Sequence, residues 1–142
     1  MKPYLFVALL ILCLLPGMSM AQIAGSFDHS FDDDGIQKFP IGTSSAFGRS
    51  VIVQSDGKLA VGCIAHNGVD NDFSLLRFNS DGKPDSAMGT NGITFTDFGS
   101  GTDIAESIAL DSLQRILIPG YADNGNGFDF VVARYEHNGI LD

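Results

Sequence analysis

Two runs of sequence that lie 57 residues apart point to the fold. The first is Asp72-Phe73-Ser74-Leu75-Leu76-Arg77-Phe78, and the second is Asp129-Phe130-Val131-Val132-Ala133-Arg134-Tyr135. Both runs keep an Asp-Phe pair, an Arg and a terminal aromatic residue at the same spacing. The offset holds without a gap from Gly35-Ile36 against Gly92-Ile93 to Gly82 against Gly139. Such self-similarity at a fixed offset is typical of a repeat architecture.

Within one repeat, turn residues separate short apolar runs. Residues 50–54 and 58–65 flank Ser55-Asp56-Gly57, and an Asp-Gly pair between β-branched runs predicts an antiparallel hairpin. Residues 73–78 are expected to form a third strand. Residues 93–96 read as a further strand, which residues 36–39 match one repeat earlier. The best helical candidate, residues 103–111, includes the counterpart of residues 47–54 and is therefore expected to be extended.

The inner strands are apolar at nearly every position, which is typical of sheets that are covered on both faces. The blades of a β-propeller have this property, because neighbouring blades cover them. We therefore expect an all-β fold: a β-propeller-like repeat array of four-stranded antiparallel blades. About two blades are present, which makes an incomplete propeller. A sandwich lacks a strict repeat, and parallel β-helices use shorter repeats.

Three segments also carry a resemblance to a known family: Phe27-Asp28-His29-Ser30-Phe31, residues 51–61 and residues 72–82. They resemble the delta-60 repeat of bacterial secreted and surface proteins, and the resemblance covers nearly all of the chain after residue 21. It implies a β-propeller-like array in large exported proteins, and it implies no catalytic residues. The second copy has Leu113-Gln114 in place of Asp56-Gly57, Ala87-Met88 in place of Ser30-Phe31, and Pro119 in place of Gly62. These departures put the second hairpin turn in question more than the fold.

The N-terminus has the features of an export signal. Lys2 precedes an apolar run over residues 5–15, and Ser19-Met20-Ala21 offers a cleavage site before Gln22. The apolar run is too short to span a membrane. We expect a signal peptide at 1–21, a leader at 22–27, repeat units at 28–84 and 85–141, and the start of a third unit at Asp142. The protein is expected to be secreted or to lie at the cell surface after cleavage near Ala21.

Composition excludes several classes of function. The formal net charge of −9 argues against nucleic acid and other anionic partners, because nucleic-acid binding needs a basic surface. After cleavage Cys63 is the one remaining cysteine, so no intramolecular disulfide is expected. Cys63 lies in an apolar run, where a buried small side chain is favoured over a reactive thiol.

Two groups of charged residues invite a functional interpretation. The run Asp32-Asp33-Asp34-Gly35 has the carboxylates that Ca²⁺ prefers, but Ile41 stands where a calcium loop places a Glu. A solvated turn is favoured, and calcium binding stays open as a hypothesis. Asp72 and Arg77 recur in the second copy and are interpreted as separately satisfied structural positions. The Arg stem is expected to pack between blades, with its head group reaching a turn carboxylate or carbonyl.

No catalytic or cofactor-binding residue is predicted. The three histidines, His29, His66 and His137, lie in separate polar turns, whereas a zinc site needs three or four converging ligands. We therefore predict no metal ligand and no cofactor. The sequence also contains no nucleophile elbow and no phosphate-binding loop.

The sequence therefore predicts a non-catalytic structural or interaction module of an exported bacterial protein. Its expected partners are a protein or a glycan at the cell surface. Propellers close with 4 to 8 blades, so two units leave apolar faces open. Either the chain is the N-terminal part of a longer β-propeller, which is favoured, or it self-associates through these faces. The alternative function is a fragment of a propeller enzyme, of the hydrolase or lyase class, or a glycan-binding propeller with its site in missing blades.

Overall fold

The computed structural model describes residues 25–99 and 101–142. The predicted signal peptide and the first residues of the leader lie outside the described residues. The described part contains eight strands and no helix, hence none long and apolar enough to cross a membrane. The strands are β1 (Ala46–Val53), β2 (Leu59–His66), β3 (Asn71–Phe78), β4 (Ile93–Thr96), β5 (Asp103–Ala105), β6 (Ala109–Leu110), β7 (Ile116–Asp123) and β8 (Phe128–Tyr135).

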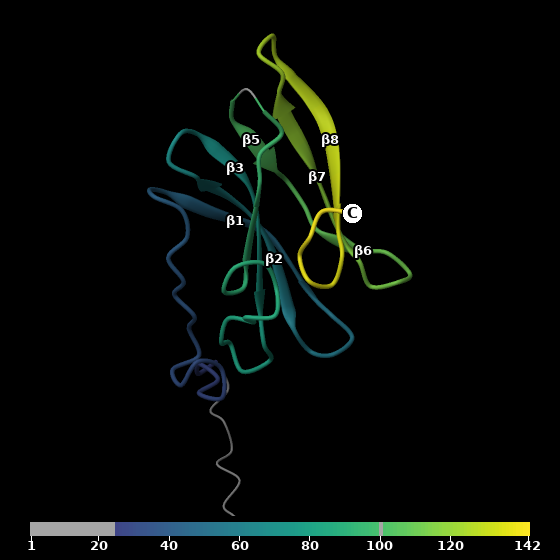
Figure 1. Cartoon of the computed structure of the whole chain (residues 1–142). Helices are drawn as coiled ribbons and strands as arrows, with labels where there is room; N and C mark the ends of the chain where they lie inside the picture. Colours follow the sequence, from purple (N-terminus) through teal and green to yellow (C-terminus); the bar gives the residue numbers. More distant parts are fainter. Residues whose placement is uncertain (1–24, 100) are drawn as a thin grey trace, which may run out of the picture.

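The first sheet is a four-stranded antiparallel meander in the order β1-β2-β3-β4. It confirms the predicted hairpin, the third strand and the strand at 93–96. The turn between β1 and β2 has Gly57 in the left-handed region, at φ 83°, which glycine adopts without steric cost. Figure 1 shows this sheet in blue to green beside the second sheet in green to yellow.

The second sheet repeats the first three strands of this plan. Strands β7 and β8 begin and end 57 residues after β2 and β3, and they pair in the same antiparallel manner. The counterpart of β1 is split into β5 and β6, which pair with the same edge of β7. The split lies opposite Pro119, which has no N–H to donate to the ladder; its carbonyl still accepts from Glu106 N–H at 3.0 Å.

The second hairpin turn forms despite its different sequence. Gln114 N–H donates to Asp111 O at 3.0 Å, as Gly57 N–H donates to Gln54 O at 2.9 Å. Gln114 takes the left-handed conformation of Gly57, with φ 63°. The turn geometry is therefore kept at a steric cost that glycine avoids.

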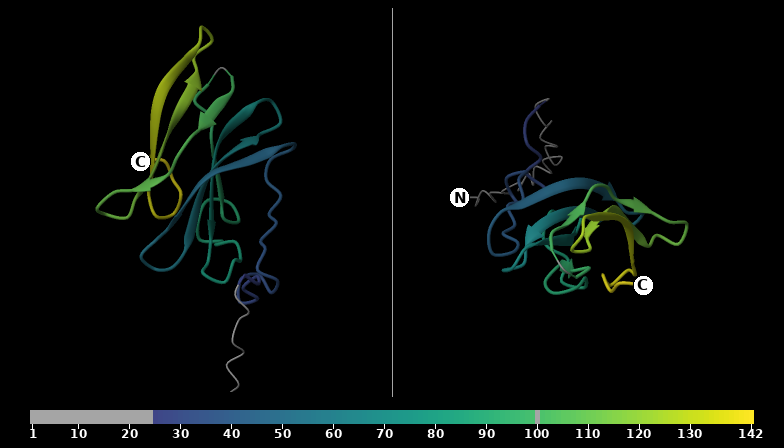
Figure 2. Two further views of the ribbon diagram at one scale, coloured as in Figure 1. Left: turned by 180° about the vertical axis from the view of Figure 1, so that it is seen from behind. Right: turned by 90° about the horizontal axis from the view of Figure 1, so that it is seen from above.

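The main core lies between the two sheets. Phe73 and Leu75 of β3 meet Ile116 and Ile118 of β7 and the ring of Tyr135, all of them buried. The Tyr135 hydroxyl donates to Thr96 Oγ1 at 2.7 Å, which adds a hydrogen bond between the sheets. Figure 2 shows from a second direction that the two sheets lie face against face and do not close into a ring. The fold is thus all-β, with two four-stranded antiparallel sheets stacked as in a propeller.

The prediction of a strand at 36–39 is wrong. Residues 36–41 have no strand structure, because no strand of the described part pairs with them. Instead this segment covers the far face of the first sheet. The Phe39 ring packs edge-on against Phe78 at 5.8 Å, and Ile41 is buried with Cys63 and Leu76 in a second, smaller core.

Candidate functional site

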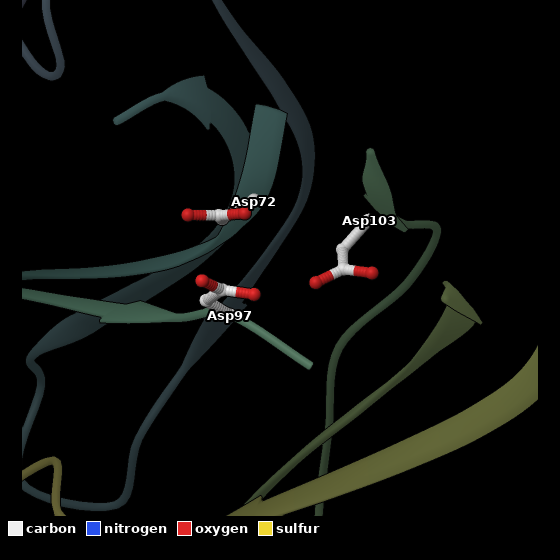
Figure 3. Close-up of side chains that lie close together, drawn as sticks. All are labelled: Asp72, Asp97 and Asp103. Atoms are coloured by element: carbon white, nitrogen blue, oxygen red, sulfur yellow. The ribbon is translucent and has the colours of Figure 1, made fainter. Parts of the chain in front are cut away.

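Three carboxylates converge at the junction between the two sheets. Asp72 lies near the start of β3, Asp97 directly follows β4, and Asp103 begins β5. One oxygen from each lies within 4.8 Å of the others, and Figure 3 shows the three side chains directed toward a common space. We call Asp72, Asp97 and Asp103 the carboxylate cluster.

Each member of the cluster has one oxygen fixed by a nearby N–H group. The Asn67 amide donates to Asp72 Oδ2, the Phe98 backbone N–H donates to Asp103 Oδ2 at 2.7 Å, and the Gly99 N–H donates to Asp97 Oδ1 at 2.6 Å. The remaining oxygens of Asp72 and Asp103 are buried without a hydrogen-bond partner in the described residues. Such orphaned buried oxygens are rare, because each costs the desolvation of a polar group.

The cluster is electrostatically unfavourable as it stands. Burial raises the pKa of Asp72 to about 6; the hydrogen bond from Asn67 opposes this rise, and the charges of Asp97, Asp70 and Asp103 add to it. Burial also raises the pKa of Asp103, and hydrogen bonds from the Phe98 and Asp123 backbone oppose this rise. The charged groups that act on these two pKa values are all carboxylates. Like charges in a poorly solvated site disfavour ionisation.

A cleft opens beside the cluster. It has a volume of about 750 Å³ and lies between β4 and residues 139–141, with Asp97 in its wall. Asp97 is exposed, whereas Asp72 and Asp103 are buried. Asp97 is therefore the member of the cluster that borders the cleft.

The prediction for Arg77 is confirmed. Arg77 is buried between the sheets, and its Nε lies 2.8 Å from Asp85 Oδ2 in the turn after β3. Its Nη1 donates to the carbonyl of His137, in the second sheet's last turn. Lys58 Nζ lies 2.9 Å from the same Asp85 oxygen. The guanidinium thus reaches both a turn carboxylate and a carbonyl across the junction.

The second copy repeats this arrangement in a more exposed setting. Arg134 Nε and Nη2 pair with Asp142 Oδ2, and Arg115 Nη1 lies 3.1 Å from it. These three residues lie 57 positions after Arg77, Asp85 and Lys58. Arg134 is exposed, since no further turn packs against it among the described residues.

The other predicted positions lie apart from the cluster. In the Asp32-Asp33-Asp34 turn, Asp34 Oδ1 accepts from Ile36 N–H at 2.8 Å, and this turn does not form a group of three converging carboxylates in the described part. His29 Nδ1 lies 3.1 Å from the Asp33 carbonyl oxygen, and His66 Nδ1, at the end of β2, lies 3.0 Å from Thr43 Oγ1. Cys63 is buried, as predicted, and burial raises the pKa of its thiol to about 11.

Sequence reasoning missed the carboxylate cluster. Asp72 was interpreted as a satisfied position, and that interpretation is wrong for its Oδ1 atom, which has no partner. Asp97 and Asp103 replace Pro40 and Ala46 of the first copy. Two acids that appear in one repeat only, on either side of a Gly-rich loop, were the signal available in the sequence.

Comparison with known families agrees with the observed sheets. A family described as "Domain of unknown function (DUF5122) beta-propeller" matches residues 54–87. This segment is thus similar to a β-propeller repeat. The matched residues run from the first hairpin turn through β2 and β3, and they include Lys58, Arg77 and Asp85. No curated protein matches the chain.

Proposed function

We propose that the chain is a non-catalytic structural and interaction module of an exported protein, secreted or held at the cell surface. Its sheets would belong to a longer β-propeller of delta-60 type. The binding surface is the outer face of the second sheet, and its partner is a further sheet of the same repeat.

The proposal rests on a comparison of equivalent positions in the two sheets. On the first sheet, Ile64, Phe73 and Leu75 are buried against the second sheet. Their counterparts 57 residues later are Tyr121, Phe130 and Val132, which are 43%, 71% and 52% exposed. The face that packs against a neighbour in one copy is thus open in the other. A continuous apolar face of this kind is typical of an interaction site.

The pairing of Tyr121 with Phe130 and of Pro119 with Val132 places these side chains on one surface of the β7–β8 ladder. Exposed Arg134 lies at the end of that surface, at the position where Arg77 reaches across to the next turn carbonyl. A further sheet would therefore find both an apolar contact and a cationic donor. Both features match the junction already formed between the two sheets.

Sedimentation equilibrium tests the binding surface. The purified protein should associate reversibly as its concentration rises, and Phe130→Asp should shift it to monomer. Leu113→Asp is the matched control, because Leu113 is similarly exposed but lies in a turn. A monomer at all concentrations, or equal effects of both substitutions, would contradict the proposal.

Export rests on the N-terminal sequence and needs its own test. The chain should be produced from residue 1 in a bacterial host, and the mass of the protein outside the cytoplasm should be determined. The proposal expects a product that begins at Gln22. An uncleaved product that stays in the cytoplasm would contradict it.

A further inference from the structure

We propose that the carboxylate cluster binds a divalent cation, Ca²⁺, which joins the first sheet to the second. The cluster draws Asp72 and Asp97 from the first sheet and its end, and Asp103 from the first strand of the second sheet. Nothing in the stacking function proposed above requires this site.

The unpartnered oxygens are free to ligate an ion. Asp72 and Asp103 are 1% and 0% exposed, and their Oδ1 atoms have no partner in the described residues. The opposite oxygen of each is fixed by an N–H group. A carboxylate that ligates a metal commonly has this division, with one oxygen on the ion and the other held by a neighbour.

The negative charge of the carboxylate cluster also favours a bound cation. Three carboxylates lie within reach of one another, and the electrostatic neighbours of Asp72 include Asp70 as a fourth. Buried charges are normally paired or bound to metal, because an uncompensated one is costly. A divalent cation would compensate two of these negative charges.

The donor set and its size favour Ca²⁺. All the offered atoms are carboxylate oxygens, which hard cations prefer over zinc or copper. Calcium lies about 2.3–2.6 Å from its oxygens, so two ligands on opposite sides are about 4.6–5.2 Å apart. One oxygen from each of the three carboxylates lies within 4.8 Å of the other two. Magnesium needs shorter distances of about 2.0–2.1 Å and a stricter geometry.

The cleft supplies access and the remaining ligands. Calcium takes 6–8 oxygens, and three carboxylates provide only part of that number. Asp97 faces the cleft between β4 and residues 139–141, from which water can complete the coordination. The ion would thus enter from the Asp97 side and reach the two buried carboxylates.

Calorimetric titration of the purified, chelator-treated protein with CaCl₂ tests the site. We expect one bound ion, with a dissociation constant of about 10⁻⁴–10⁻³ M, as in extracellular calcium modules. At a 20-fold excess over that constant, the melting temperature should rise by about 3 to 6 °C. MgCl₂ should bind at least about tenfold more weakly.

Two substitutions distinguish Ca²⁺ binding at the carboxylate cluster from a general effect of removing one negative charge. Asp103→Asn should weaken Ca²⁺ binding at least about tenfold and should raise the melting temperature without metal, because it removes like-charge repulsion. Asp129→Asn is the matched control: Asp129 is the counterpart of Asp72 and accepts from Asn124 at 2.6 Å, as Asp72 does from Asn67. It has no counterpart of Asp97 or Asp103 beside it in the described residues, so binding should be unchanged.

Three outcomes would overturn the proposal. One is the absence of heat and of any melting shift with Ca²⁺ up to 10 mM, roughly tenfold above the weakest constant expected. Another is equal loss of binding in Asp103→Asn and Asp129→Asn. The third is stabilisation by acid alone, with no response to Ca²⁺ near neutral pH, which would show that the carboxylates share a proton instead.

Discussion

Arg77 and Asp85 form a buried ion pair, with Nε 2.8 Å from Oδ2, that recurs one repeat later as Arg134 and Asp142. Burial raises the pKa of Asp85, but the hydrogen bonds from Lys58 and from Ala87 N–H, together with the charge of Arg77, hold that pKa below its ordinary value. The first pair also reaches His137 in the second sheet. The ion pair therefore stabilises the same turn in both copies, and in the first copy it also joins the first sheet to the second.

Arg77→Ala should lower the free energy of unfolding by about 3 kcal/mol, because removal of one partner leaves a buried charge poorly compensated. Arg134→Ala should cost at most about 1 kcal/mol, since that pair is exposed to water. Urea denaturation of both variants measures the difference. Equal costs would contradict the assignment of the first pair to the junction.

Phe73 and Phe130 form a second matched pair. Phe73 is fully buried and packs edge-on against Phe98 at 5.1 Å, so Phe73→Ala should cost about 3–5 kcal/mol. Phe130→Ala removes a mostly exposed ring and should change the stability of the monomer by less than about 1 kcal/mol. Denaturant titration at low protein concentration distinguishes them. A large loss from Phe130→Ala would show that its ring is buried in the isolated chain.

The stability of the metal-free protein should fall as the pH rises from about 4 to 7. The pKa of Asp72 rises from 3.8 in the unfolded chain to about 6 in the fold, so its stabilising contribution is complete below 3.8 and is lost through pH 6. At about 1.4 kcal/mol per pH unit, the loss is at most about 3 kcal/mol. Urea denaturation in a chelator measures it, and Asp72→Asn should flatten the profile in this window. A stability that rises over the same range would contradict the assignment.

The thiol of Cys63 should be inert in the folded protein. It is buried, and burial raises its pKa to about 11, so almost none of it is thiolate at pH 8. A thiol-specific reagent should react only as fast as the protein opens, and urea should accelerate the reaction sharply. Rapid labelling under native conditions would show that the small core around Cys63 and Ile41 is not closed.

The sequence predicted the parts of the fold that local patterns determine. Strands β2 and β3 share apolar runs with β7 and β8, and similar turns flank them. The 57-residue offset therefore predicts the positions of β7 and β8 from those of β2 and β3. Residues 36–39 failed as a strand because strand formation also needs a partner, which a local pattern does not reveal. Pro119 explains the split of the strand opposite it, an effect that depends on register.

The candidate site was less accessible to sequence reasoning. Asp97 and Asp103 meet Asp72 only because the chain crosses from the end of β4 to β5 in the second sheet. Their counterparts in the first copy are Pro40 and Ala46, so only this difference between the two copies marks them in the sequence. The cluster depends on how two sheets stack, which is a tertiary property.

Native-state hydrogen exchange tests the central claim, that two equivalent sheets stack into one cooperative unit. Because Phe73 and Leu75 of β3 share a core with Ile116 and Ile118 of β7, the amides of both strands should open with the same, highest free energy. Their exchange should merge into one global transition as denaturant is added. If the amides of β7 and β8 instead open at a distinctly lower free energy than those of β2 and β3, the two sheets do not form one stacked unit.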